Sequence, residues 1–287
     1  MPQTANDSTM TNTLSPSHYR GRIAPSPTGY LHLGHAKTFW TAFQRCRQAE
    51  GTLVYRNEDV DFQRCKDHFA DAAQEDLHQL GIRWDEGPFH QSQRTNLYRS
   101  ALERLRELDL IYPCRASRKQ IREHPETQLS EIGEVIFPTS LRAESSSSTQ
   151  PTDLKTNWRY KVPASGQIDF IDQNLGPQSF TCQSDFGDFL VWRKEGMPSY
   201  ELAVVVDDID MRITEVVRGA DLLISTARQL LLYNALESEP PQFFHEHLVL
   251  DESGERLAKQ KDSLALRKLF ADGHTLESLQ NLWTARS

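Results

Sequence analysis

Apolar positions over the first part of the chain predict strands that alternate with helices. A short strand at 20–24 ends in a turn with two prolines and a glycine, which interrupt the hydrogen bonding of a strand. Helical spacing predicts a helix over 36–50, and a second strand follows at 53–56. Two more helices are expected over 66–80 and 94–108. This alternation favours a parallel sheet with crossover helices.

The middle of the chain has a different pattern. Residues 111–199 are rich in turns, and their apolar positions form short alternating segments such as 158–162. A stretch at 143–149 contains mostly serine and has low complexity. We therefore expect an inserted α+β module, with a disordered loop near 143–152.

The α/β pattern returns after the insert. The continuous apolar run at 202–206 is typical of a strand buried on both faces. Strands are also expected at 213–217 and 247–250, on either side of a helix over 221–236. A polar loop follows at 251–261.

These patterns together predict an α/β protein with five parts. Residues 1–18 are rich in Thr, Ser and Asn and lack apolar periodicity, so we expect a disordered leader. The parallel-sheet domain is formed by 19–110 and 200–261, which the insert at 111–199 separates. Residues 262–287 are expected to form a helical tail.

Composition narrows the class of protein. The chain has 38% apolar and 25% charged residues, which is ordinary for a globular protein. No apolar stretch is long enough to span a bilayer and no secretory signal is present, so we expect a cytoplasmic protein with no membrane partner. The net charge of −8 argues against a surface that binds nucleic acid everywhere, but not against a local basic patch. The four cysteines contain no CxxC pair, which favours isolated thiols.

Segment 22–35 carries candidate nucleotide chemistry, because it follows a strand and opens a helix. A helix N-terminus presents unpaired N–H groups to an anion, and Gly29 and Gly34 allow close approach of the backbone. His32 and His35 are three residues apart, so both can face one side of the first turn and donate to phosphate oxygens. Such histidines are also common as helix caps, and by themselves they leave both roles open.

The same segment resembles the HIGH signature of class I aminoacyl-tRNA synthetases, in the glutamyl form Arg-x-Ala-Pro-Ser-Pro-Thr-Gly-x-Leu-His-x-Gly-His. Stretches 56–61, 200–208 and 217–222 resemble further motifs of this family. They fall at the C-terminal ends of predicted parallel strands, where open α/β sheets bind ligands. The resemblance covers roughly 19–270 and implies a Rossmann-type catalytic domain with an inserted acceptor-binding-like subdomain.

The resemblance implies a glutamate site. Arg22 and Arg218 can each bind a carboxylate bidentately, which Lys cannot do. Glu58 would balance the ammonium group, and Tyr200 would supply a hydroxyl. The residues alone also allow Arg22 and Glu58 to be a buried ion pair. Carried over residue by residue, the expected glutamate contacts are Arg22, Ile23, Ala24, Pro25, Ser26, Glu58, Tyr200 and Arg218.

A loop near the end resembles the second family signature, KMSKS, with Arg256 and Ala258 in place of its usual Lys and Ser. A cation on such a loop can stabilise charge that develops on ATP phosphates, and Lys259 holds that position. The missing Ser hydroxyl could slow turnover. The resemblance implies ATP as a substrate with Mg²⁺ at its phosphates, catalytic roles for Lys259, His32 and His35, and ATP contacts from His32, Gly34, His35 and Lys259.

The subgroup that fits best is the glutamyl-Q tRNA(Asp) synthetases, which attach glutamate to the queuosine base of tRNA(Asp). The string 214–222 and Gln260 favour it, and the chain ends soon after Lys261, with no room for an anticodon-binding region. The expected partners are L-glutamate, ATP and queuosine-containing tRNA(Asp), and a monomer is expected.

Other functions stay open at this point. A truncated glutamyl-tRNA synthetase would charge a tRNA 3′ end, and a non-catalytic paralogue would only bind glutamate. The intact set of Arg22, Glu58, Tyr200, Arg218 and Lys259 argues against the second. An unrelated nucleotidyltransferase of the same fold would leave those residues unexplained.

Many members of this family hold zinc with three cysteines and a tyrosine. The matching positions here are Cys114, Ala116, Phe137 and Leu141, so a single thiolate remains. One such ligand cannot hold tetrahedral zinc. We therefore expect no zinc, with packing around Phe137 in its place.

Overall fold

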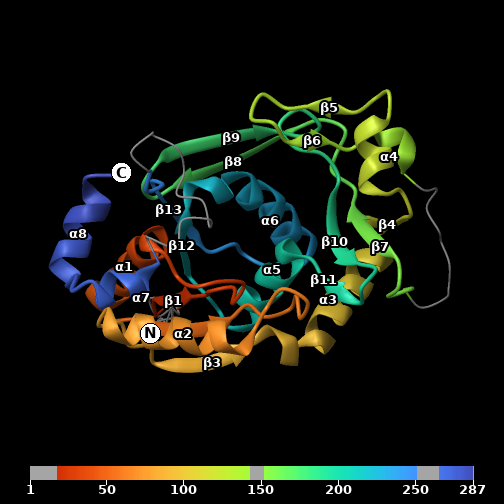
Figure 1. Ribbon diagram of the computed structural model, residues 1–287. Coiled ribbons are helices and arrows are strands. Elements are labelled where there is room, and N and C mark those ends of the chain that lie inside the picture. Colours follow the sequence, from red (N-terminus) through yellow and green to blue (C-terminus); the bar gives the residue numbers. More distant parts are fainter. Residues whose placement is uncertain (1–17, 143–151, 251–264, 287) are drawn as a thin grey trace, which may run out of the picture.

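The computed structural model describes residues 18–142, 152–250 and 265–286. Residues 1–17, most of the serine-rich loop and the loop of Lys259 lie outside the described residues, so the predictions made for them stay predictions. Figure 1 shows the arrangement of the elements. The strands are β1 Arg20–Ile23, β2 Thr52–Asn57, β3 Glu86–His90, β4 Ile111–Cys114, β5 Gln128–Leu129, β6 Val135–Ile136, β7 Asn157–Tyr160, β8 Gln167–Asp172, β9 Gly176–Thr181, β10 Phe189–Arg193, β11 Met197–Pro198, β12 Glu215–Gly219 and β13 Gln242–Glu246.

Helices connect and cover these strands. The α-helices are α1 Leu33–Gln48, α2 Asp67–Gln79, α3 Thr95–Glu107, α4 Arg118–Glu123, α5 Tyr200–Asp210, α6 Leu223–Ala235, α7 Leu266–Ala271 and α8 Leu276–Thr284, with short 3-10 turns at Gln91–Gln93, Thr139–Leu141 and Ala220–Leu222. No helix in the described ranges is both long and apolar enough to cross a membrane.

A parallel sheet forms the centre of the molecule and confirms the predicted fold class. β1 pairs with β2 and β2 with β3, while β12 pairs with β13, all in parallel register. The two groups adjoin at β1 and β12, where the amide of Thr214 donates to the carbonyl of Arg20 at 2.9 Å. The C-terminal ends of β1, β2 and β12 therefore lie close together.

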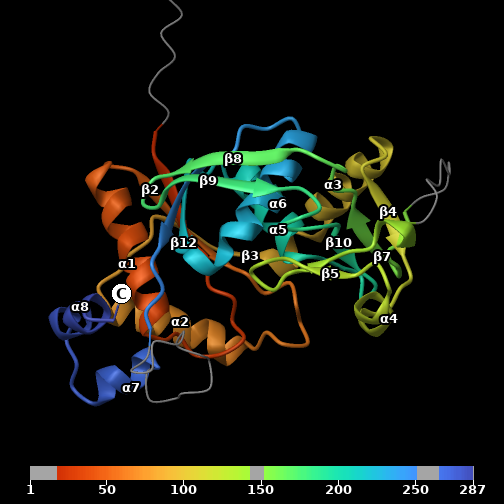
Figure 2. The ribbon, with the colours of Figure 1, turned by 90° about the horizontal axis from the view of Figure 1, so that it is seen from above.

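Helices cover both faces of this sheet, because successive side chains of a strand point to opposite faces. In β2, Leu53 and Tyr55 pack into a core with α1, α2 and the two C-terminal helices. Val54 packs into a second core with α3, α5 and α6. Figures 1 and 2 both show α7 and α8 beside α1, at the end of the molecule opposite β4 and β7.

The apolar run at 202–206 forms helix α5, so the predicted strand was wrong. Ser199 caps this helix by accepting from the amide of Leu202 at 3.4 Å. The run is buried throughout because α5 packs against α3, α6 and β10. A helix enclosed on all sides gives the same continuous apolar pattern as a buried strand, so periodicity could not separate the two.

Two strand positions also differ from the prediction. β12 begins at Glu215 and runs to Gly219, two residues beyond the expected range. β13 lies at 242–246, before the strand predicted for 247–250. β13 has only two apolar residues, Phe243 and Phe244, and its buried His245 and Glu246 are held by polar partners, so its pattern is less uniform than that of 247–250.

The segment predicted as an insert forms more than one sheet. β11, β10, β7 and β4 make an antiparallel sheet, and β5 pairs with β6. The β8–β9 hairpin instead extends the central sheet, because Asp172 of β8 pairs with Phe243 of β13. This places Asp172 beside β13, the strand that carries His245.

Candidate active site

A cavity of about 790 Å³ opens at the C-terminal ends of β1, β2 and β12. His32, Gly34 and His35 line it from the start of α1, and their contact with ATP stays a prediction. Among the predicted glutamate contacts, Ile23 does not line it, since this side chain is fully buried in the core with α1. The other predicted glutamate contacts line the cavity, namely Arg22, Ala24, Pro25, Ser26, Glu58, Tyr200 and Arg218.

Buried charges lie at the base of this cavity. Arg56 is fully buried and donates to Asp208 Oδ1 at 2.7 Å and to Glu58 Oε1 at 3.1 Å. Arg22 donates from Nη1 to the carbonyl of Val217 at 2.9 Å, and its Nε lies 4.0 Å from Asp208 Oδ1. Among the described residues no ion pair joins Arg22 to Glu58, since Arg22 lies near Asp208 and Glu58 pairs with Arg56. The structure therefore does not contain the simple Arg22–Glu58 ion pair that the sequence alone allowed.

These charges are desolvated but incompletely paired. Burial lowers the pKa of Arg22, although the carboxylate of Asp208 acts in the other direction. Burial raises the pKa of Glu58, against the effect of Arg56. Arg22 Nε has no hydrogen-bond partner in the described part of the chain. A ligand that brings a carboxylate to Arg22 and an ammonium group to Glu58 would improve both environments.

Tyr200 stands in the first turn of α5 and lines the cavity, and 39% of its surface is exposed. The protein around the hydroxyl desolvates the phenolate and raises the pKa of Tyr200 to about 12, although Arg218 opposes this. The hydroxyl therefore stays protonated at neutral pH and can donate a hydrogen bond. Neighbouring Glu201 is used differently, since it accepts from Ser225 and Gln229 of α6.

Arg218 is held from behind by a network that the sequence analysis did not find. Its Nη2 donates to Thr226 Oγ1 at 2.6 Å, and its Nε lies 3.2 Å from His245 Nε2. His245 Nδ1 in turn lies 2.6 Å from Asp172 Oδ2. These residues come from β12, α6, β13 and β8, and no spacing in the sequence relates them.

His32 and His35 form a capping box at the start of α1. His32 Nδ1 accepts from the amide of Gly34, and His35 Nδ1 accepts from the amide of His32, both at 3.2 Å. The two rings stack with centroids 3.7 Å apart. These hydrogen bonds show the capping role. Both rings also line the cavity, and their contact with phosphate stays a prediction.

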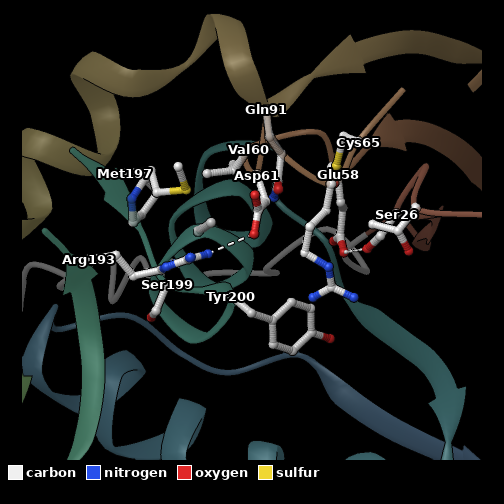
Figure 3. A pocket seen from close by; sticks show the side chains of 14 residues that line it. Ser26, Glu58, Val60, Asp61, Cys65, Gln91, Arg193, Met197, Ser199 and Tyr200 are labelled. Carbon is white, nitrogen blue, oxygen red and sulfur yellow. Dashed lines mark hydrogen bonds and ion pairs between the residues drawn. The ribbon is translucent and has the colours of Figure 1, made fainter. Parts of the chain in front are cut away.

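A smaller cavity of about 260 Å³ shares Ser26, Glu58 and Tyr200 with the larger one. Figure 3 shows Arg193 of β10 pointing at Asp61 of the loop after β2, and the two form an ion pair of 2.7 Å. Asp61 Oδ1 is buried without a partner among the residues that the structure describes. This side cavity was also missed, because its walls come from distant parts of the chain.

The four positions matching a zinc site pack together. Cys114 and Phe137 are buried in a small apolar cluster, and Ala116 and Leu141 pack against it. The guanidinium of Arg159 lies 4.3 Å from the centre of the Phe137 ring. The expected packing around Phe137 is therefore confirmed. Within the described ranges no group of three or more His, Cys, Asp or Glu side chains could hold a metal.

Fold and site together define a class I aminoacyl-tRNA synthetase catalytic domain. The model of the family "tRNA synthetases class I (E and Q), catalytic domain" matches residues 18–281. The chain belongs to this family and is a ligase.

Individual relatives refine this assignment. A protein named glutamyl-Q tRNA(Asp) synthetase from Nitratidesulfovibrio vulgaris is 42% identical over 87% of this chain and 80% of its own length. Its namesake from Symbiobacterium thermophilum is 40% identical over 90% of this chain and 83% of its own length. A glutamate–tRNA ligase from Paraburkholderia phymatum is 33% identical, over 91% of this chain and 56% of its own. The crystal structure of glutamate-tRNA synthetase from Elizabethkingia anophelis matches with a TM-score of 0.73 and 26% identity, over 90% of this chain and 54% of its own.

Proposed function

We propose that this chain activates L-glutamate with ATP and transfers the glutamyl group to the queuosine base of tRNA(Asp). The observation that carries the proposal is that Arg22, Glu58 and Arg218 line one cavity. Together they present two positive charges and one negative charge to a ligand. Glutamate has the complementary set of two carboxylates and one ammonium group. Substrates with one carboxylate would leave a desolvated arginine unpaired, at a cost of a few kcal/mol.

Activation follows from how the cavity would hold two substrates. A carboxylate oxygen of glutamate attacks the α-phosphorus of ATP, which forms glutamyl-adenylate and releases pyrophosphate. His32 and His35 at the start of α1 would contact ATP, and Lys259 would approach its phosphates. Mg²⁺ would be held by those phosphates and supply further positive charge. Positioning of the two substrates and electrostatic stabilisation would account for most of the catalysis.

Transfer of the glutamyl group to tRNA requires a route by which the acceptor reaches the acyl carbon of the adenylate. The side cavity supports this step, because it shares Ser26, Glu58 and Tyr200 with the glutamate site. A hydroxyl of the acceptor entering there would attack the acyl carbon of the adenylate and release AMP. Tyr200 lies between the two cavities and would orient the acyl group.

The identity of the acceptor rests on the relatives. Those named glutamyl-Q tRNA(Asp) synthetase are 40–42% identical to this chain, whereas the glutamate–tRNA ligases are 33–36% identical. The rival function is therefore glutamylation of a tRNA 3′ end. A chain that only binds glutamate is the other alternative.

One assay separates these functions. Purified chain is incubated with labelled glutamate, ATP and either queuosine-containing tRNA(Asp), unmodified tRNA(Asp) or tRNA(Glu). We expect label only on the queuosine-containing tRNA, and we expect it to persist when the 3′-terminal adenosine has been removed. Labelling of tRNA(Glu), or loss of label with that adenosine, would establish the rival. Absence of glutamate-dependent ATP–pyrophosphate exchange, with and without tRNA, would leave only a binding function.

A further inference from the structure

We propose that His245, oriented by Asp172, sets the direction of the Arg218 guanidinium and so determines how tightly the amino-acid carboxylate is held. His245 is a positioning residue in this role, since it is fully buried behind Arg218 and does not line the cavity. The inference rests on the proposed glutamate site, because Arg218 is there assigned to a substrate carboxylate.

Hydrogen bonding determines which nitrogen of His245 carries the proton. Arg218 Nε–H is a donor, so the nitrogen 3.2 Å away, His245 Nε2, must be the acceptor. The proton then resides on Nδ1, which donates to Asp172 Oδ2 at 2.6 Å. Asp172 is itself held in place, because its carboxylate also accepts from the amides of Asn174 and Leu175.

The neutral form of His245 is the one that this network needs. Burial lowers the pKa of His245 to about 4, and the positive charge of Arg218 acts in the same direction, whereas Asp172 opposes both. A protonated ring would place two cations in contact and remove the acceptor for Arg218. The ring is therefore neutral at neutral pH and available to Arg218 as an acceptor.

The network leaves one end of Arg218 for a ligand. Nε is directed to His245 and Nη2 donates to Thr226 Oγ1. Nη1 is buried and has no hydrogen-bond partner in the described ranges. A guanidinium anchored on one edge keeps its remaining donor in a single direction, which reduces the entropy lost when a carboxylate binds.

Two amide variants of one residue test this directly. In H245Q the side-chain amide reaches the position of Nε2 and can accept from Arg218, whereas in H245N it reaches only the position of Nδ1 and contacts Asp172. We expect H245N to raise the KM for glutamate about tenfold or more, the effect of losing a hydrogen bond to a charged group. H245Q should stay within about threefold of the unmodified chain, and the KM for ATP should change little in both.

Asp172→Asn tests the role of the tautomer without a change of shape. An amide NH₂ facing Nδ1 would favour the ring with its proton on Nε2, and two donors would then face each other at Arg218. We expect D172N to resemble H245N in ATP–pyrophosphate exchange, with a raised glutamate KM. Thermal unfolding of each variant identifies any that lose structure.

The outcomes distinguish this inference from the proposed function. Equal glutamate KM values in H245N, H245Q and the unmodified chain would overturn the positioning role alone. A parallel rise in the KM values for glutamate and ATP would reduce it to a general structural role. If the unmodified chain shows no glutamate-dependent exchange with or without tRNA, both the proposed function and this inference fail.

Discussion

At the scale of single residues, His245 couples the stability of the protein to pH. Its pKa is lowered to about 4 in the fold, by burial first and then by Arg218, whereas an exposed histidine titrates near 6.5. The unfolded chain therefore binds more protons between these values, so stability is present above about pH 6.5 and is lost as pH falls toward 4.

This loss can be measured by denaturant unfolding. Between pH 7 and pH 5 we expect the free energy of unfolding of the unmodified chain to fall by about 2 kcal/mol more than that of H245Q. Glu58 and Glu201 have raised pKa values and act in the opposite direction, but they do so in both proteins. The same pH dependence in both proteins would contradict the buried neutral histidine.

Tyr200 permits a second residue-scale prediction. Because its hydroxyl stays protonated and faces the cavity, Y200F should lower kcat/KM for glutamate about tenfold or more. The matched control is Y160F, since the Tyr160 hydroxyl contacts the carbonyl of Leu231 outside the cavity. Steady-state exchange kinetics would measure both. An equal loss in the control would mean that tyrosine hydroxyls act here through stability.

Some of the residues that line the cavity could be predicted from the sequence. Arg22, Glu58, Tyr200 and Arg218 were predicted from motifs, and all four line the cavity. The side chain of Ile23 does not line the cavity, because alternate side chains at the end of a strand point away from it into the core. His245 and Asp172 could not be found, since they meet only through the pairing of β8 with β13.

At the scale of elements, the four positions matched to a zinc site form a small packed cluster. Phe137 is 2% exposed and contacts both the apolar cluster and Arg159. We expect F137A to lower the free energy of unfolding by about 3 kcal/mol, the usual loss for a buried Phe. F62A, which removes a side chain that is 64% exposed, should change it by less than about 0.5 kcal/mol.

The cluster around Cys114 and Phe137 also allows a test for bound zinc. A chelator should leave the thermal unfolding temperature of the unmodified chain unchanged, because Cys114 alone cannot bind zinc tetrahedrally. Elemental analysis of the purified protein should find less than one zinc per chain. Stoichiometric zinc, or a lower unfolding temperature after chelation, would refute the absence of a zinc site.

The secondary structure was predictable where apolar spacing was unambiguous. α1, α2 and α3 lie where helical spacing placed them, within a few residues at each end. α5 was assigned wrongly, because a run of five apolar residues has no period that separates a strand from an enclosed helix. A continuous apolar run indicates that a segment is buried. Whether the segment is a strand or a helix depends on the elements that pack around it.

At the scale of the whole molecule, segments far apart in the chain meet at the side cavity. Arg193 of β10 and Asp61 after β2 close it with their ion pair. We expect R193A to leave glutamate-dependent exchange within about twofold while lowering glutamyl transfer to tRNA about tenfold. The loss should not be rescued by more glutamate.

The control for this prediction is K194A, which removes one positive charge from the neighbouring exposed position. If a general loss of charge explained the effect, both variants would weaken tRNA binding with a similar dependence on salt. Single-turnover transfer from preformed adenylate is the measurement. Equal rates in R193A and the unmodified chain would show that the acceptor does not use this cavity.

The sequence by itself indicated the parallel α/β core and the charged residues Arg22, Glu58 and Arg218 of the larger cavity. Local periodicity and contiguous motifs carry that information, because a strand end and the loop after it are adjacent in the chain. Only the tertiary structure decided that α5 is a helix, that the β8–β9 hairpin joins the central sheet, and that Asp172 and His245 stand behind Arg218. Such contacts depend on strand order and on the desolvation of charges, which arise only when distant segments pack together.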